Sequence, residues 1–94
     1  MTPRVKFEWD PRKARENAKK HGVTFDEAMT VFADWGSIAI SDPDHSEGEE
    51  RYLIVGLSSR ERILVVSHVE RAENVRIINA RRANARERKL YGGT

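Results

Sequence analysis

The chain has no cysteine among its 94 residues, so neither disulfide bonds nor thiolate chemistry is available to it. No apolar run approaches the roughly 20 residues that span a membrane, which argues against a transmembrane helix. The first residues, MTPRVKFEWD, lack the apolar segment of a secretion signal. These absences predict a cytoplasmic protein with no membrane partner.

Hydrophobic residues make up 38% of the chain and charged residues 34%. The apolar residues fall in periodic blocks, which is typical of a folded domain and not of a disordered chain. A length of 94 residues suits one hydrophobic core and leaves little room for a second. We therefore expect a single domain over residues 1–94.

The net charge is only +2, but the two signs are segregated along the sequence. Basic residues dominate 11–21 and 76–89, whereas 42–50 is acidic. Arginine outnumbers lysine in the last basic block, and its planar guanidinium suits bidentate contacts with phosphate. The pattern indicates a polyanion partner, or an acidic protein that resembles one. The alternative is an ordinary charged surface.

The N-terminal half predicts a short strand over residues 5–9 followed by two helices. The first helix covers 11–20, because Asp10 followed by proline is a typical start and Gly22 a typical end. The second begins at Thr24 with the sequence of a capping box. Its apolar residues recur at helical spacing and are expected to cover a sheet: Phe25, Ala28, Met29 and Phe32.

The C-terminal half predicts four strands, over 37–41, 51–57, 62–69 and 75–80, and a helix over 85–91. Asn84 can cap that helix, with Glu87 at the reciprocal position. Consecutive strands joined by short turns imply an antiparallel sheet of four to five strands. With two N-terminal helices and one C-terminal helix packed on one side of it, the expected fold class is α+β.

The last two strands are predicted to form a hairpin, and this hairpin carries candidate functional residues. A hairpin without a bulge pairs Glu70 with Val75 and His68 with Ile77. That register collects four polar side chains around one apolar face: His68, Glu70, Asn79 and Arg81. A histidine, a carboxylate and an arginine at one face suit acid–base chemistry on an anion. The alternative is that the charges are merely solvated at the end of a hairpin.

The acidic loop after residue 41 contains potential metal ligands: Asp42, Asp44, His45, Glu47 and Glu49. Their spacing does not match a calcium-binding loop, because Ser46 stands where such a loop needs a ligand. A turn at Asp42-Pro43-Asp44 is the simpler interpretation. The sequence predicts no metal site and no cofactor.

Six short motifs occur along the chain in a characteristic order: FEWDP at 7–11, KHGV at 20–23, F-x-E-A at 25–28, DPDHSEGEER at 42–51, VV-x-H-x-ER at 65–71 and RIINARRA at 76–83. Together they resemble the BrnT toxins of bacterial type II toxin–antitoxin systems. The resemblance implies a RelE-like fold and an endoribonuclease that arrests translation. It also implies an antitoxin of the BrnA type, with a ribbon-helix-helix part through which the complex would bind operator DNA.

Metal-independent RNA cleavage needs a base for the 2′-hydroxyl, an acid for the 5′-oxygen and a cation for the crowded phosphorane. The predicted catalytic residues are His68, Glu70, Arg81, Lys20 and Arg71. The predicted RNA-binding residues are Arg76, Arg82, Arg86, Arg88 and Lys19. His21 and Tyr91 are further acid–base candidates, although His21 also fits a role at the end of a helix. The assignment of base and acid stays open at this point.

Two other functions compete with cleavage. The same basic face would serve a nucleic-acid-binding module without catalysis, or a corepressor that acts only with a DNA-binding antitoxin. The chain contains no helix-turn-helix, zinc or RNA-recognition signature, which weakens the binding-module alternative. Trp9 and Trp35 are expected to pack in the core or at a hinge, and not to stack on bases.

Overall fold

The computed structural model describes residues 5–42 and 50–92. The strands are β1 (Lys6–Glu8), β2 (Ile38–Ser41), β3 (Arg51–Leu57), β4 (Ile63–Arg71) and β5 (Asn74–Arg82). The helices are α1 (Pro11–His21), α2 (Phe25–Thr30) and α3 (Ala85–Gly92), with a 3-10 turn, η1 (Val31–Ala33), after α2. Within the described ranges, no helix has the length and apolar character needed to cross a membrane.

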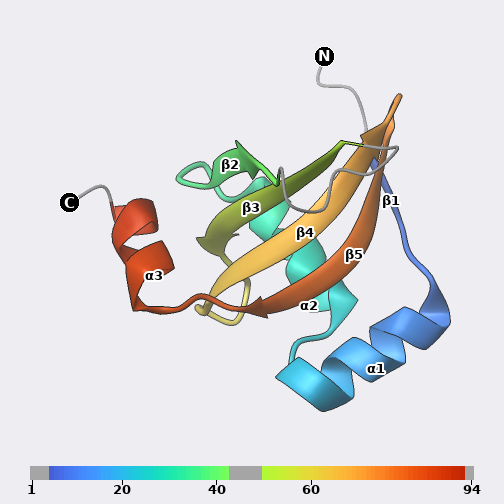
Figure 1. Cartoon of the computed structure of the whole chain (residues 1–94), viewed down its shortest axis with the longest axis horizontal. Coiled ribbons are helices and arrows are strands. Elements are labelled where there is room, and N and C mark those ends of the chain that lie inside the picture. Colours follow the sequence, from blue (N-terminus) through green and yellow to red (C-terminus); the bar gives the residue numbers. More distant parts are fainter. Residues whose placement is uncertain (1–4, 43–49, 93–94) are drawn as a thin grey trace.

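The five strands form one mixed sheet in the order β1-β5-β4-β3-β2 (Figure 1). Strands β2 to β5 pair antiparallel, as the short turns predict. The prediction of an entirely antiparallel sheet was wrong at β1, which runs parallel to β5 with Phe7 opposite Val75. Apolar alternation identifies a strand but says nothing about its neighbour, and β1 reaches β5 only through a long crossover.

The helix ends form where local sequence chemistry predicts them. The Asp10 carboxylate accepts a hydrogen bond from the Arg12 backbone N–H at 2.8 Å and starts α1. Gly22, with φ of 68°, ends α1 in the left-handed conformation that glycine tolerates. The Thr24 hydroxyl caps α2 by accepting from the Glu27 backbone N–H at 3.1 Å. These caps set the directions in which the two helices reach the sheet.

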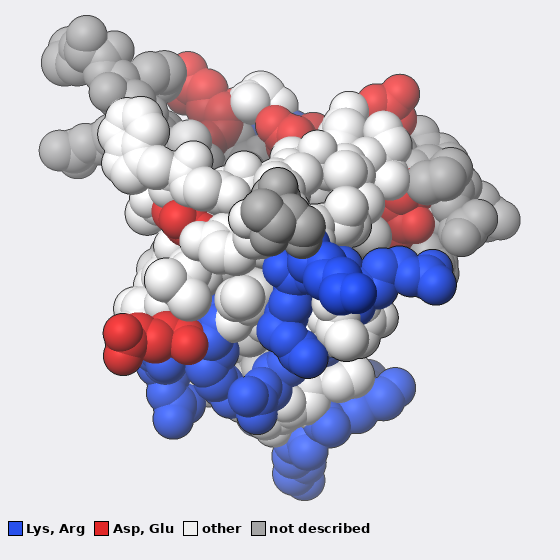
Figure 2. Space-filling model, turned by 90° about the vertical axis from the view of Figure 1, so that its left-hand side faces the viewer, with Lys and Arg blue, Asp and Glu red and all other residues white. Residues whose placement is uncertain are grey.

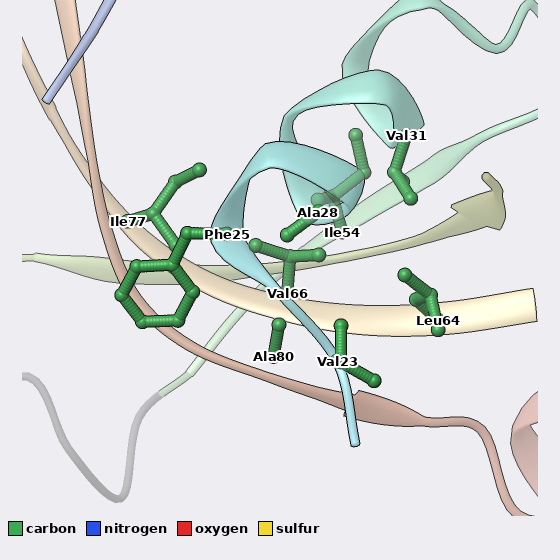
Figure 3. Packing of buried hydrophobic residues seen from close by; sticks show 9 residues of the cluster. All are labelled: Val23, Phe25, Ala28, Val31, Ile54, Leu64, Val66, Ile77 and Ala80. Atoms are coloured by element: carbon green, nitrogen blue, oxygen red, sulfur yellow. The ribbon is translucent and has the colours of Figure 1, made fainter. Parts of the chain in front are cut away.

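The main core lies between α2 and one face of the sheet, which we call the helix face (Figure 3). Two of the four residues predicted to cover the sheet, Phe25 and Ala28, are fully buried there. Met29 and Phe32 are only partly buried and pack at the edge of the cluster. The strands contribute five buried residues to it: Ile54, Leu64, Val66, Ile77 and Ala80.

The opposite face of the sheet, which we call the open face, is covered at one end by α3. Tyr91 of α3 packs against Val55 and Val65, whose side chains point away from α2. The prediction that all helices lie on one side of the sheet was therefore wrong for α3 (Figure 1). Strand β3, with the sequence RYLIVGL, carries apolar residues on both faces, and such a strand needs cover on both.

Helix α1 lies against the part of β5 that extends beyond β1. The Asn17 side chain is buried, and its amide donates to the Ala80 carbonyl at 2.8 Å and to the Val23 carbonyl at 2.9 Å. Its amide oxygen accepts from the Ala80 backbone N–H at 3.1 Å. Asn17 thus takes the place of a neighbouring strand and satisfies an edge that would otherwise lose its hydrogen bonds.

Candidate functional site

A β-bulge in the β4–β5 hairpin decides which polar residues meet. Near the turn, Glu70 is opposite Val75 and His68 is opposite Ile77, as the hairpin pattern predicts. The register then shifts, so that Ser67 is opposite Asn79 and Ile78 is the extra residue.

The shift turns Asn79 and Arg81 to the open face, whereas His68 stays on the helix face. The prediction that these side chains edge one common face with Glu70 was therefore wrong. In the unbulged register Arg81 would oppose Leu64, whose side chain is fully buried in the core. Burying an arginine there would cost far more than one irregular backbone step, so the bulge is the less costly arrangement.

His68 is a buried side chain with aromatic neighbours. It is 3% exposed, its ring meets Phe32 edge-on at 4.8 Å between centroids, and Nδ1 lies 3.3 Å from the Val66 carbonyl. Burial lowers the pKa of His68, and this outweighs the opposite effects of the Val66 carbonyl and the Glu70 carboxylate. The histidine is therefore neutral around pH 7.

The pocket beside His68 is apolar and has a volume of about 420 Å³. Phe7, Met29 and Phe32 contribute to its wall, and Glu70 is the charged residue that lines it. No lysine or arginine is among the described residues that line the pocket. This site offers no described cation for a phosphate, and Arg71 lies apart from it at the tip of the hairpin.

A protonated His68 is expected to destabilise the fold. The folded-state pKa of His68 lies below the ordinary value of 6.5. The stability that its neutral form gives the fold is therefore fully present above pH 6.5, and it is lost as pH falls through the lowered pKa. Urea unfolding of the wild type should show a falling free energy of unfolding over this window, and His68→Leu should lack that step. His21→Gln is the matched control, because it removes a histidine outside the core. Equal pH slopes for wild type and His68→Leu would contradict this account.

The open face contains a cleft of about 570 Å³ in which cations from three elements meet. Lys13 comes from α1, Arg51 from β3 and Arg81 from β5. The same cleft is also lined by one carboxylate, that of Asp42, so among the described residues three cations face a single acidic residue there. A smaller hollow of about 190 Å³ adjoins it and is lined by Lys20 and His21 at the end of α1. Both hollows share three lining residues, Lys13, Ile78 and Asn79, so we treat them together as the open-face cleft.

Arg81 is held in a fixed orientation by Glu87 of α3. Its two terminal nitrogens donate to the two carboxylate oxygens at 2.7 and 2.8 Å. This pairing raises the pKa of Arg81 and lowers the pKa of Glu87, so both groups stay charged. Glu87 is itself positioned by a reciprocal cap with Asn84, in which each backbone N–H donates to the other side chain at 2.9 Å. The predicted capping of α3 thus serves to orient an arginine in the cleft.

The predicted RNA-binding residues are spread over several elements. Arg76 lies on the open face and faces Glu8 of β1 at 4.0 Å. Arg88 on α3 donates to the Ala83 carbonyl at 2.9 Å, while Arg86 is exposed. Arg82 and Lys19 are exposed but do not line the cleft. On the side of the molecule that carries α3, lysine and arginine gather over the centre and lower half (Figure 2).

Sequence reasoning placed Arg81 and Lys20 in the functional set, and the structure brings both to the open-face cleft. It missed Lys13 and Arg51 as site residues. The strand alternation that puts Arg51 on the same face as Leu53 was a usable signal for Arg51. For Lys13 there was no such signal, because it reaches the cleft only through the packing of α1 beside β5.

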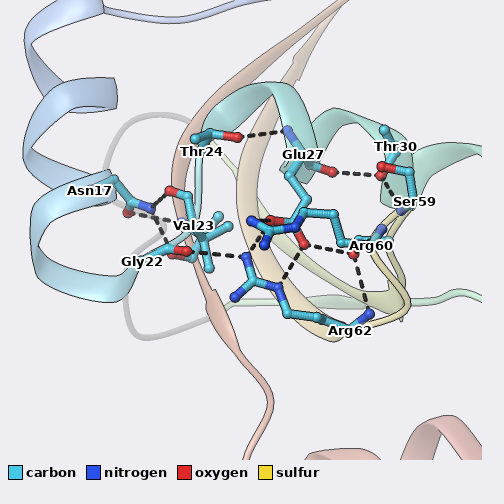
Figure 4. Close-up of polar contacts among 11 residues, drawn as sticks. Asn17, Gly22, Val23, Thr24, Glu27, Thr30, Ser59, Arg60 and Arg62 are labelled. Carbon is cyan, nitrogen blue, oxygen red and sulfur yellow. Dashed lines mark hydrogen bonds and ion pairs between the residues drawn. The ribbon is translucent and has the colours of Figure 1, made fainter.

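A second cluster of charged residues is buried and stabilises the fold, and it does not face a substrate site (Figure 4). The Glu27 carboxylate accepts from the Arg62 guanidinium through both of its oxygens, and from the Ser58 hydroxyl at 2.7 Å. Arg62 also donates to the Gly22 carbonyl at 3.1 Å. The cluster joins α2 to the β3–β4 turn and lies apart from the cleft.

Among the described residues, no group of three or more histidine, cysteine, aspartate or glutamate side chains is arranged to hold a metal ion. Four of the potential ligands named in the acidic loop, Asp44, His45, Glu47 and Glu49, lie outside the described part of the chain.

Comparison with known proteins gives a family match over most of the chain. The family model described as the ribonuclease toxin, BrnT, of a type II toxin–antitoxin system matches residues 9–87. The chain belongs to the BrnT family. This confirms the resemblance that the ordered motifs indicated and makes the chain a ribonuclease toxin by family. No curated protein sequence matches it.

The fold is shared with a solved BrnT structure. The crystal structure of the Brucella abortus ribonuclease toxin BrnT is similar with a TM-score of 0.63 and 21% sequence identity. The match covers 86% of this chain and 99% of the Brucella chain. At that identity the likeness shows a common α+β fold. That this fold is RelE-like stays a prediction.

Proposed function

We propose that this BrnT-family chain is an endoribonuclease that cleaves RNA in the open-face cleft, by attack of the 2′-hydroxyl and without a metal ion. The observation that carries the proposal is the fixed Arg81 guanidinium, which lines one cleft with Lys13 and Arg51. Cleavage by this route builds negative charge on a phosphorane, and preorganised cations are the groups that stabilise it.

Each cation in the cleft has a role in this proposal. Arg81 binds the non-bridging oxygens of the phosphate and stabilises their charge in the transition state. Lys13 and Arg51 hold the neighbouring phosphates, so that the 2′-oxygen, the phosphorus and the 5′-oxygen come into line. The Asn79 side chain, also in the cleft, supplies a neutral hydrogen-bond donor to the same backbone.

Lys20 and His21 supply the proton transfers in this scheme. They line the hollow that adjoins the cleft, so they flank the position of the scissile bond. Imidazole suits acid–base catalysis near neutral pH, so we assign to His21 the base that takes the proton of the 2′-hydroxyl. Lys20 beside it is assigned as the acid that protonates the departing 5′-oxygen. The predicted catalytic roles of His68, Glu70 and Arg71 stay predictions, and the proposed site does not require them.

The longer path of the RNA follows the other cations of the open face. Arg76, Arg86 and Arg88 are proposed to contact phosphates on either side of the cleft, with Arg82 and Lys19 adding sequence-independent attraction. Such contacts set affinity and register and carry no base specificity. Binding should weaken as salt concentration rises.

The family description implies an antitoxin, and we propose that it is of the BrnA type. Its ribbon-helix-helix part would carry the complex to operator DNA, while this chain contacts no DNA itself. The complex would act in the cytoplasm, where the messenger RNA is translated. Release of the antitoxin would free the active toxin and arrest translation.

The proposal is tested by incubating the purified chain with a defined RNA, in EDTA and without ribosomes. We expect fragments that end in a 2′,3′-cyclic phosphate and a 5′-hydroxyl, because the 2′-oxygen is the attacking group. Fragments with a 3′-hydroxyl and a 5′-phosphate would contradict the mechanism, because water would then be the nucleophile. Activity that EDTA abolishes and a divalent cation restores would contradict metal independence.

The second candidate function is binding without catalysis, either of nucleic acid or as a corepressor with the antitoxin. The same cluster of cations favours it, since phosphate contacts alone would use these side chains. Folded chain that binds the RNA but leaves it intact, with ribosomes present as well as absent, would support this function instead.

A further inference from the structure

The two edges of the sheet are protected very differently. At one edge, β1 is a three-residue strand with charged Lys6 and Glu8, and beyond it Asn17 closes the edge of β5. At the other edge lies β2, with the sequence IAIS and no charge, proline or glycine. Exposed edges are normally blunted by such devices, because their free backbone groups attract other strands. Strand β2 therefore has the character of an edge that a partner covers.

The pairing of β2 shows which of its backbone groups are free to bind. Asp42, the residue after β2, donates its backbone N–H to the Arg51 carbonyl at 2.8 Å. Hydrogen-bonded pairs alternate along an antiparallel ladder, so Ile40 and Ile38 also bond toward β3. The N–H and C=O groups of Ala39 and Ser41 then point outward, and both residues are exposed. Among the described residues, none pairs with this side of β2.

Apolar side chains flank the same edge. Trp35, in the turn just before β2, is fully exposed, so the prediction that it packs in the core or at a hinge was wrong. Its turn is held by Asp34, whose carboxylate accepts from the backbone N–H of Gly36 at 3.0 Å and of Leu57 at 2.8 Å. Ile40 is 43% exposed on the open face of β2. On the helix face, Ala39 lines the apolar pocket of about 420 Å³ beside Phe32.

We infer that the antitoxin adds an extended segment to the outer edge of β2, with apolar side chains placed against Trp35 and Ile40 on one side and in the pocket beside Ala39 on the other. Strand addition of this kind takes its affinity from backbone hydrogen bonds and its specificity from pockets for alternate side chains. The inference rests on the antitoxin partnership proposed above and names the surface that the partner uses.

An antitoxin segment fits this surface better than a second copy of the chain. Two four-residue β2 strands paired with each other would bury far less than the roughly 1,200 Å² that a stable interface needs. A separate polypeptide can pair with β2 and continue past Trp35, and so reach that area. The surface is also distinct from the open-face cleft, since neither Trp35 nor Ala39 lines it.

The test uses a purified cognate antitoxin of the BrnA type and three variants of the chain. Trp35→Ala removes an exposed aromatic anchor, and we expect the Kd to rise about 30-fold or more. Ala39→Pro removes only an outward N–H, which an edge strand tolerates, and we expect about a tenfold rise. Leu90→Ser, which removes a 51% exposed leucine from α3, is the control and should leave the Kd unchanged.

Hydrogen exchange and the oligomeric state of the chain alone separate this surface from its alternatives. Hydrogen exchange at the amides of Ala39 and Ser41 should slow at least tenfold in the complex, because those groups become hydrogen-bonded. An unchanged Kd for both edge variants, or unchanged exchange, would overturn the docking surface while leaving the partnership intact. A folded wild-type chain that does not bind the antitoxin would overturn the partnership as well. A chain that dimerises alone, and loses the dimer with Ala39→Pro, would assign β2 to a second copy instead.

Discussion

Replacing Arg81 with alanine is expected to lower the rate of RNA cleavage about 100- to 1,000-fold, because the transition state loses its oriented cation. The loss should appear in single-turnover cleavage of a defined RNA at saturating protein, where binding no longer limits the rate. Arg81→Lys should recover only part of the rate, since an ammonium group cannot reproduce the bidentate geometry that Glu87 holds.

The controls for Arg81 separate chemistry from charge and from folding. Arg60→Ala removes the same charge from the β3–β4 turn, where that side chain is 68% exposed, and should leave cleavage within about threefold of the wild type. The Arg81→Ala variant should unfold at nearly the wild-type urea concentration, because its ion pair is partly exposed. A folded Arg81→Ala variant with wild-type cleavage would remove the open-face cleft as the site.

Replacing Glu27 with glutamine is expected to lower the free energy of unfolding by about 3 kcal/mol, because it leaves the Arg62 guanidinium partly buried without its counter-ion. The Glu27 side chain is 4% exposed and that of Arg62 19%, so solvent cannot replace the lost interaction fully. Ser58 loses its carboxylate acceptor in the same step. Urea denaturation followed by circular dichroism measures the change.

The Glu27 effect also has a defined dependence on pH. The hydrogen bond from Arg62 is the largest influence on Glu27 and lowers its pKa below the ordinary value of 4.5. A depressed carboxylate pKa stabilises the fold above pH 4.5, and this is lost as pH falls through the lowered value. The difference between wild type and Glu27→Gln should therefore shrink in acid.

A double variant distinguishes a lost ion pair from general damage to α2. Glu27→Met combined with Arg62→Met replaces both charges with apolar groups of similar length, and we expect it to recover at least half of the lost stability. A double variant as unstable as the sum of the two single variants would contradict the pairing. RNA cleavage should be retained by the folded double variant, because the cluster lies outside the open-face cleft.

Local chemistry allowed several elements to be predicted from the sequence. Asp10, Gly22 and Thr24 mark helix ends because each satisfies backbone groups within a few residues of itself. The hairpin pairing of Glu70 with Val75 followed from turn length in the same way. The Asn84–Glu87 cap was predicted too, although its second role, to orient Arg81, was not.

The candidate site was predicted only in part, because it depends on one backbone irregularity. Extrapolating a regular register from the hairpin turn put Arg81 with His68, and the bulge at Ile78 separated them. The hint was present in the sequence, since a regular register would have placed an arginine opposite Leu64 in a face made of leucine and valine. Burying that arginine in the apolar face would cost more free energy than one irregular step in the β4–β5 pairing, so the bulge forms.

The sequence by itself determined the family, the helix caps, the segments that form strands and the segregation of charge, since each depends on neighbouring residues or on their order. The tertiary structure alone decided that β1 runs parallel to β5, that α3 crosses to the open face and that Lys13 meets Arg51 and Arg81. These outcomes join residues far apart in the chain. The packing is set by which apolar faces must be buried and which charges must stay in water. Neither requirement can be read from the residues of a single helix or strand.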